Sequence, residues 1–139
     1  MSNYIAGVLD DSEYWYNQGD ALFKLGCYQE ALASFDQALG IQPNHYQTWI
    51  LRGGVLSHLD CYQQALASFE QALALKPNDQ TALLFKGVAL HHLGYYEEAF
   101  SYYDQALGIE RKSFWRTLIQ KFNKWVHGNF MSISHSSPT

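Results

Sequence analysis

The sequence has few of the features that mark secreted, membrane-spanning or nucleic-acid-binding proteins. It contains two cysteines and three prolines in 139 residues, and no apolar run is long enough to cross a bilayer. The first residues lack a basic stretch followed by an apolar one, so we expect no secretion signal and a cytoplasmic location. The formal net charge of -4 argues against nucleic acid as a partner.

Motifs for catalysis or cofactor binding are also missing. The sequence has no phosphate-binding glycine loop, no nucleophile motif and no zinc-finger spacing. His91 and His92 are neighbours and point in different directions on a helix, which leaves His58 and His92 as a possible pair. Two histidines without a third ligand make a weak metal site. We therefore expect no enzyme activity, no metal and no cofactor.

The chain instead repeats itself every 34 residues. The stretch CYQEALASFDQALGIQPN, which begins at residue 27, has a near copy, CYQQALASFEQALALKPN, at residue 61 and a looser one, YYEEAFSYYDQALGIERK, at residue 95. A fixed period without insertions indicates stacked structural units. Equivalent positions of stacked helices lie roughly 10 Å apart. Because a disulfide needs a shorter separation, we interpret Cys27 and Cys61 as reduced packing residues.

Each unit is predicted to contain two amphipathic helices. Apolar residues recur at steps of three or four on both sides of a short connection, where Gly26 and Gly94 suit a left-handed helix end. Pro43 and Pro77 end the second helix, so the following polar residues, Asn44, Asn78 and Asp79, are candidates to cap the next one. Glycines also stand inside each first helix, where we expect another backbone to approach closely: Gly19, Gly53 and Gly87.

These columns resemble the tetratricopeptide repeat over residues 12–113. The matching residues are Trp15, Gly19, Ala31, Phe35, Ala38 and Pro43 in the first copy, and Trp49, Gly53, Ala65, Phe69, Ala72 and Pro77 in the second. The third copy has Leu83 in place of tryptophan and Arg111 in place of proline. The resemblance implies an all-α fold, a right-handed α-solenoid of three antiparallel helix pairs, whose first helices line a concave groove that binds another protein.

This reading divides the chain into six parts. They are an N-terminal lead-in at 1–11, repeats at 12–45, 46–79 and 80–113, a C-terminal amphipathic helix at 114–128 and a polar flexible tail at 129–139.

The groove can be assigned by removing the internal columns from each first helix. The remaining face carries Glu13, Tyr16, Asn17, Asp20, Phe23, Lys24, Gln47, Ile50, Leu51, Gly54, Ser57, His58, Thr81, Leu84, Phe85, Val88, His91 and His92. Within it, an apolar floor is expected from Ile50, Leu51, Leu84, Phe85 and Val88. An exposed apolar floor indicates a partner with apolar side chains, or else a further helix of the same chain packed there.

One ligand class is disfavoured by the resemblance. Family members that hold chaperone C-termini use Lys, Asn and Arg side chains to bind two carboxylates. The matching positions here are Tyr16, Asp20, Leu51, Thr81 and Phe85, none of which is basic.

The charge changes sign near residue 110. Residues 1–110 hold four basic and thirteen acidic residues, a charge of -9, whereas residues 111–139 hold five basic residues and no acidic one, a charge of +5. Ser113 is a candidate cap for a helix that ends near Gly128. Its apolar stripe comprises Trp115, Leu118, Ile119, Phe122, Trp125 and Val126.

Three interpretations of this helix stay open. It can cap the open end of its own stack, with its polar side turned outward. It can enter the groove of a second copy and form a homodimer held by opposite charges. It can also lie on an anionic membrane surface, because Lys and Arg oppose Trp and Phe on its two faces.

Overall fold

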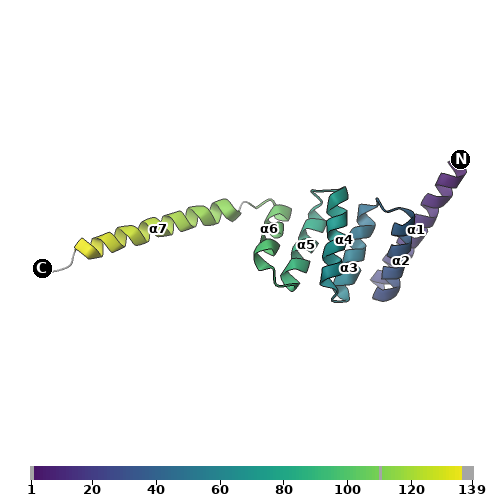
Figure 1. Cartoon of the computed structure of the whole chain (residues 1–139), viewed down its shortest axis with the longest axis horizontal. Coiled ribbons are helices and arrows are strands. Elements are labelled where there is room, and N and C mark those ends of the chain that lie inside the picture. The colour runs from purple at the N-terminus through teal and green to yellow at the C-terminus, as the bar shows by residue number, and fades with distance from the viewer. Residues whose placement is uncertain (1, 110, 136–139) are drawn as a thin grey trace. The chain divides into compact units, whose positions relative to one another are not determined.

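The computed structural model describes the backbone of residues 2–109 and 111–135 and the side chains of residues 11–109 and 116–129. These residues form helices joined by short turns, with no strand among them: α1 Ser2–Lys24, α2 Tyr28–Ile41, α3 Tyr46–His58, α4 Tyr62–Leu75, α5 Gln80–His92, α6 Tyr96–Leu107 and α7 Arg111–His135. The chain forms two compact units, 1–107 and 108–139. In the first unit, three antiparallel pairs follow one another as a solenoid, α1 with α2, α3 with α4 and α5 with α6 (Figure 1).

The turn inside each pair uses a left-handed residue at the same position of the repeat. Gly26 has a φ of 80° and Gly94 a φ of 90°, as predicted, and Asp60 takes this position in the second repeat with a φ of 59°. A left-handed residue lets the chain reverse directly after the helix end. The connections within the pairs are therefore tight.

The caps between repeats match the prediction only in part. Asp79 precedes α5, and its carboxylate accepts a hydrogen bond of 2.9 Å from the backbone N–H of Ala82. Asn44 was expected to cap α3 but does not, because α3 begins one residue later, with His45 at the cap position. His45 does not bond the helix backbone with its side chain; its Nδ1 lies 2.6 Å from Oγ1 of Thr48.

An aromatic ring explains the glycine inside each first helix. A Cβ atom added to Gly53 would lie 2.4 Å from the ring of Phe69 on α4, and Gly19 and Gly87 meet Phe35 and Tyr103 in the same way. At Gly19 and Gly53 the close neighbour is thus a side chain of the paired helix, not the backbone that we expected, whereas at Gly87 the backbone carbonyl of Ala99 on α6 also lies close, at 3.1 Å. Phe35 and Phe69 are almost fully buried, so each ring fills the space that its glycine leaves.

The repeats join through two junctions of the same design. Val55 of α3 is fully buried with Ala31 and Phe35 of the preceding repeat. Ala89 of α5, 34 residues later, is fully buried with Ala65 and Phe69. An ion pair crosses each junction beside these contacts, from Arg52 to Asp36 at 2.6 Å and from Lys86 to Glu70 at 3.5 Å.

The C-terminal helix is longer than predicted. It begins at Arg111, so Ser113 is not its cap, and it continues through Gly128 to His135, where a flexible tail was expected. An interior glycine costs a helix only about 1 kcal/mol, and no proline occurs between Arg111 and His135 to stop it. Residues 136–139 lie outside the described part. Helix α1 likewise begins at Ser2, inside the predicted lead-in.

Candidate partner-binding groove

The first helices of the three repeats enclose a hollow of about 460 Å³ on one face of unit 1. Its walls come from α1, α3 and α5, with one residue from the start of α4. The lining residues are Phe23, Ile50, Leu51, Gly54, Ser57, His58, Tyr62, Phe85, Val88 and His92. The expected groove of the first helices is therefore a concave, largely apolar surface.

Two residues of the expected apolar floor are exposed to solvent. Phe85 is 42% exposed and Val88 36%, although both lie on α5, whose other faces are buried. The ring of Phe85 rests against the buried ring of Phe69, with 5.8 Å between their centres. Phe85 is therefore supported on one side by Phe69, while part of its ring stays exposed to solvent.

Two predicted floor residues have a different role. Ile50 lines the hollow but is only 8% exposed, because it packs with Ala72 and Ala82 in the core between repeats. Leu84 is half-buried and does not line the hollow. The accessible floor consists instead of Phe23, Leu51, Phe85 and Val88, which we call the groove floor.

Tyr62 is the lining residue that the sequence reasoning missed, because it belongs to a second helix. Burial raises the pKa of its hydroxyl, and so does the hydrogen bond of 3.1 Å that this hydroxyl donates to Asp60. The ring of His92 stacks on Tyr62 with 4.2 Å between the ring centres. The same position of the first repeat holds Tyr28, on which His58 stacks at 4.7 Å. The recurrence of tyrosine at this position of the repeat is the sequence feature from which Tyr62 could have been predicted.

The histidines therefore serve as ring contacts. His58 and His92 each line the hollow beside a tyrosine, whereas His91 turns toward α6 and contacts Tyr96, with 5.0 Å between ring centres. Among the described residues, no three histidine, cysteine or acidic side chains are placed to hold a metal ion.

A second hollow, of about 360 Å³, lies at the start of the groove. It is more polar than the first and is lined by Ser12, Glu13, Tyr16, Asn17, Gln42, His45 and Gln47. Burial, followed by the charge of Asp20, raises the pKa of Tyr16 there. Asp20 itself pairs with Lys24 at 2.9 Å, and neither of these two residues lines either of the two hollows described above, nor does Thr81.

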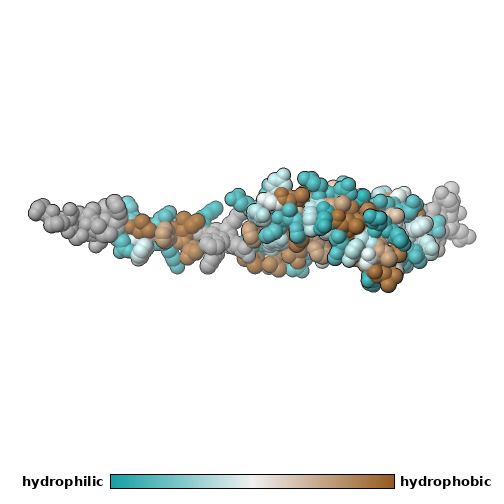
Figure 2. Space-filling view, turned by 90° about the horizontal axis from the view of Figure 1, so that it is seen from below, coloured by the Kyte–Doolittle hydropathy of each residue, from teal (hydrophilic) through white to brown (hydrophobic). Residues whose placement is uncertain are grey.

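The apolar stripe of α7 is exposed wherever its side chains are described. The exposed fractions are 44% for Leu118, 55% for Ile119, 62% for Phe122, 64% for Trp125 and 40% for Val126. The side chain of Trp115 lies outside the described residues. In Figure 2, brown apolar side chains gather along the coloured part of α7 beside teal polar ones. None of the helices in the described part is long and apolar enough to span a membrane.

Comparison with known proteins identifies the repeats. Two family models described as tetratricopeptide repeat match residues 12–45 and 59–113, together more than half of the chain. No curated protein sequence matches the chain.

Solved structures share the fold. The TPR domain of Arabidopsis OM64 is 24% identical with a TM-score of 0.71, over 76% of this chain and 87% of that one. A crystal structure of MamA is 24% identical with a TM-score of 0.69, over 76% and 61%. The second TPR of Spaghetti (RPAP3), bound to the HSP90 peptide SRMEEVD, is 20% identical with a TM-score of 0.70, over 73% and 94%. The chain thus belongs to the tetratricopeptide repeat family, an all-α solenoid family of protein-interaction modules.

Proposed function

We propose that the protein is a non-catalytic adaptor whose groove binds an apolar segment of a partner protein. The observation that carries this proposal is the groove floor of Phe23, Leu51, Phe85 and Val88 in an open hollow of about 460 Å³. A hollow of this size and composition is typical of sites that accept a few apolar side chains. Helices and extended peptides both present such side chains at regular spacing.

Burial of the floor would supply the binding energy. Apolar surface contributes about 25 cal/mol for each Å² removed from water, and Phe85 and Val88 keep more than a third of their surface exposed. His58 and His92 stand at the edge of the floor and provide the few polar groups that orient a ligand. A partner segment with two or three large apolar residues on one side fits this arrangement.

The charge of the groove favours a different ligand from that of the Spaghetti domains. Those domains are bound to the acidic peptide SRMEEVD. Here neither hollow is lined by a lysine or arginine, and the nearby Lys24 is already paired with Asp20. An acidic C-terminal peptide would therefore find no cation to bind its carboxylates. We propose a neutral apolar segment instead.

The experiment is a selection from a random peptide library against the full chain, followed by fluorescence anisotropy on the selected peptides. Leu51→Asp and Phe85→Asp are expected to weaken binding at least about 100-fold, because each puts a charge into the floor. Leu75→Asp is the matched control, since Leu75 is 44% exposed on α4 and does not line the hollow. Retained binding by both groove variants would refute the proposal.

A second candidate function rests on the exposed stripe of α7. Its residues are 40% to 64% exposed, and residues 111–139 carry five basic residues with no acidic one. A helix with Trp and Phe on one face and Lys and Arg on the other is typical of binding to an anionic membrane surface. We propose this surface as the site of α7, in preference to the homodimer, because the groove hollow has no acidic lining residue to attract the basic face.

Vesicle sedimentation tests this second function. The full chain is expected to bind vesicles that contain phosphatidylserine, to release them at high salt, and to ignore neutral vesicles. Trp125→Asp should abolish binding, whereas Phe85→Asp should not change it. Binding to neutral and anionic vesicles alike, or no binding at all, would refute the proposal. Dimers that Trp125→Asp dissolves would favour the homodimer instead.

A further inference from the structure

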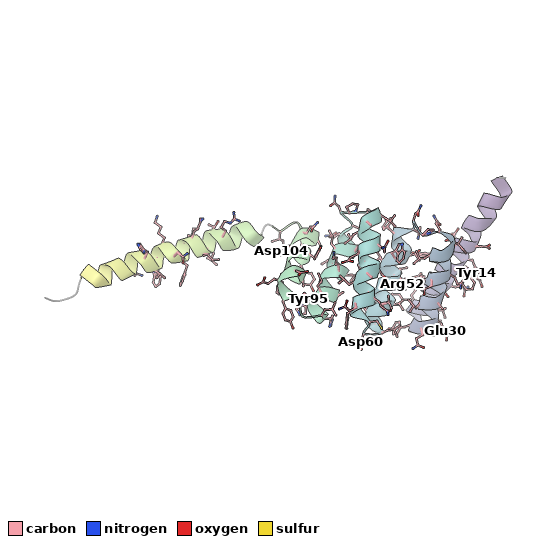
Figure 3. The ribbon with its side chains drawn as sticks, in the orientation of Figure 1. Tyr14, Glu30, Arg52, Asp60, Tyr95 and Asp104 are labelled. Carbon is pink, nitrogen blue, oxygen red and sulfur yellow. The ribbon has the colours of Figure 1, made fainter. Side chains whose placement is uncertain are left out.

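A third hollow, of about 400 Å³, opens between the second and third repeats, where α4, α5 and α6 meet. It shares no lining residue with the two hollows of the groove. Its floor is apolar, because Leu90 is buried and Leu66 and Leu93 are half-buried there. Tyr95, another lining residue, lies beside the turn between α5 and α6, where Figure 3 labels it. We call this site the junction pocket.

The rim of the junction pocket carries more negative than positive charge. Its charged lining residues are Glu70, Lys86 and Glu98. The ammonium group of Lys86 lies 3.5 Å from the carboxylate of Glu70. Glu98 forms no ion pair with any residue of the described part of the chain. One carboxylate of the rim is therefore left for a cation from outside.

Two tyrosine rings complete the junction pocket. The ammonium group of Lys86 lies 4.4 Å from the ring centre of Tyr102, so the pocket already holds one cation against an aromatic face. Tyr95 is 52% exposed and provides a second ring. An apolar floor below carboxylates and aromatic faces suits a long cationic side chain, whose methylene groups contact the leucines while its charged end stays at the rim.

The preceding junction holds a guanidinium group at the same place. Arg52 precedes Lys86 by one repeat period. Its guanidinium donates hydrogen bonds to Asp36 at 2.6 Å and to the buried hydroxyl of Ser68 at 2.7 Å. The chain thus shows that a guanidinium fits between the second helices of neighbouring repeats.

The second junction differs from the first in the residues around this place. The differences remove the guanidinium and add one carboxylate and two aromatic rings. At matching positions, Lys86 stands for Arg52, Glu98 for Gln64, Tyr95 for Cys61 and Tyr102 for Ser68. One basic and one acidic residue balance at the first junction, whereas the second has one basic and two acidic residues. The second junction therefore has the acceptors for a guanidinium that it does not itself supply.

This surface stays open when a further repeat follows it. The third repeat follows the first junction, yet the residues there that match the rim of the junction pocket are exposed: Gln29, Asp36 and Gln64. Access to the junction pocket therefore does not depend on where the solenoid ends.

We infer that the junction pocket binds an arginine side chain of a partner protein. The guanidinium donates hydrogen bonds to Glu98 and lies against the ring of Tyr95, and its stem contacts the leucine floor. Because the pocket and the groove share no residue, both sites can be occupied at once, and the adaptor can link two partners. This linking role rests on the proposed groove function, whereas the arginine site does not.

The test is an NMR titration of the full chain with the pentapeptide Gly-Gly-Arg-Gly-Gly, blocked at both ends. The peptide is expected to bind saturably, with a Kd on the order of 1 mM for a single side chain, and to shift the amide signals of Tyr95, Glu98 and Tyr102. The same peptide with lysine should bind at least about threefold more weakly, because an ammonium group lacks the planar fork of donors. The peptide with citrulline, whose urea group is neutral, should not saturate.

Two substitutions should change the affinity in opposite directions. Glu98→Gln should weaken the arginine peptide at least about fivefold, because it removes the free carboxylate. Glu97→Gln is its matched control, since Glu97 is exposed on α6 and does not line the pocket. Lys86→Met should strengthen binding about threefold, because it frees Glu70 and the face of Tyr102. Its control, Lys24→Met on α1, should have no effect.

Several results would overturn the inference. They are an arginine peptide that does not saturate, equal binding of the lysine or citrulline peptide, and an equal loss of affinity in Glu97→Gln and Glu98→Gln. Dimers that Glu98→Gln dissolves, seen by light scattering, would give the pocket to a basic residue of a second copy instead. Phe85→Asp in the groove should leave arginine binding unchanged, so the failure of this inference is distinguishable from a failure of the groove proposal.

Discussion

Helices α5 and α7 lie one repeat period apart, yet they use the positions of that period in different ways. At the positions that pack inside the solenoid, α5 has Ala82, Gly87 and Ala89, whereas α7 has Arg116, Lys121 and Asn123. At the α5 positions that were predicted to form the groove floor, and at the matching positions of α7 in the sequence, both helices are apolar, with Leu84, Phe85 and Val88 in α5 and Leu118, Ile119 and Phe122 in α7.

The difference shows where the solenoid ends. The spacing of apolar residues continues past residue 110, but the small and apolar residues that allow two helices to pack closely do not. A lysine at the position of Gly87 would collide with the ring that fills this space in each repeat. Helix α7 therefore has an apolar face but lacks the small and apolar residues that the first helices of the repeats use for packing.

The largest expected effect is the loss of stability caused by a charge at the junction position of α5. The same charge at the matching position of α7 serves as the comparison. Ala89→Asp should destabilise unit 1 by about 4 kcal/mol or more, because Ala89 is fully buried and the carboxylate would have no partner. Asn123→Asp, at the same position of α7, should change stability by less than about 0.5 kcal/mol. Urea denaturation followed by circular dichroism measures both. Equal effects would mean that α7 packs as α5 does.

A second pair of substitutions tests the space beside the repeat glycines that the aromatic rings fill. Gly53→Leu should cost about 3 kcal/mol, because even a Cβ atom at Gly53 lies 2.4 Å from the ring of Phe69. Lys121→Leu, at the matching position of α7, should be neutral or slightly stabilising. The same denaturation experiment measures the two variants. A Gly53→Leu protein as stable as the unmodified chain would show that Phe69 can move aside.

The ion pairs across the junctions should contribute less. Arg52 donates hydrogen bonds to Asp36 at 2.6 Å and to the buried hydroxyl of Ser68 at 2.7 Å, so Arg52→Met should cost about 1 to 2 kcal/mol. Lys86→Met removes the contact of 3.5 Å with Glu70 and the contact of the ammonium group with the ring of Tyr102, 4.4 Å from the ring centre, and should cost about 1 kcal/mol or less. Thermal melts measure both variants, and the melting temperature of Arg52→Met should be the lower of the two. A lower melting temperature for Lys86→Met would contradict the prediction.

The smallest expected effect is a loss of stability of unit 1 in alkaline solution. Burial, then the charge of Asp20, raises the pKa of Tyr16 above its ordinary value of 10.0, and burial also raises that of Tyr103. Below that ordinary value the hydroxyls are neutral in both states, and stability is unaffected. As the pH rises past it, the unfolded chain ionises first, so unit 1 loses stability.

Thermal melts at about pH 8 and pH 11 measure this loss, and Tyr16→Phe should reduce it. Residues 111–139 contain no tyrosine, so α7 contributes nothing to it. A melting temperature with the same pH dependence in Tyr16→Phe would contradict the assignment to Tyr16.

The repeat architecture was predictable from the sequence because it depends on a few residue types with fixed roles. Gly26 and Gly94 end helices with a positive φ, and Asp79 caps α5, as expected. These roles are local and need no knowledge of neighbouring repeats.

The predictions from sequence were wrong or incomplete where the position of a residue depends on the neighbouring helices, or where small contributions to helix stability decide the end of a helix. Ile50 faces both the groove and the core, and periodicity does not distinguish these two directions; contacts with Ala72 and Ala82 bury it. Tyr62 enters the hollow from the second helix, which the assignment by first helices left out. The end of α7 was misplaced because Gly128 was treated as a stop, although one glycine costs a long helix little.

The central claim, that the groove floor binds an apolar segment, is tested most directly by mapping a selected peptide onto the full chain by NMR. The account predicts that the largest amide shift changes occur at Leu51, Phe85 and Val88, and that Leu75 on α4 stays unchanged. Changes confined to α2, α4 and α6, with the groove residues unaffected, would contradict it and place the binding surface on the second helices.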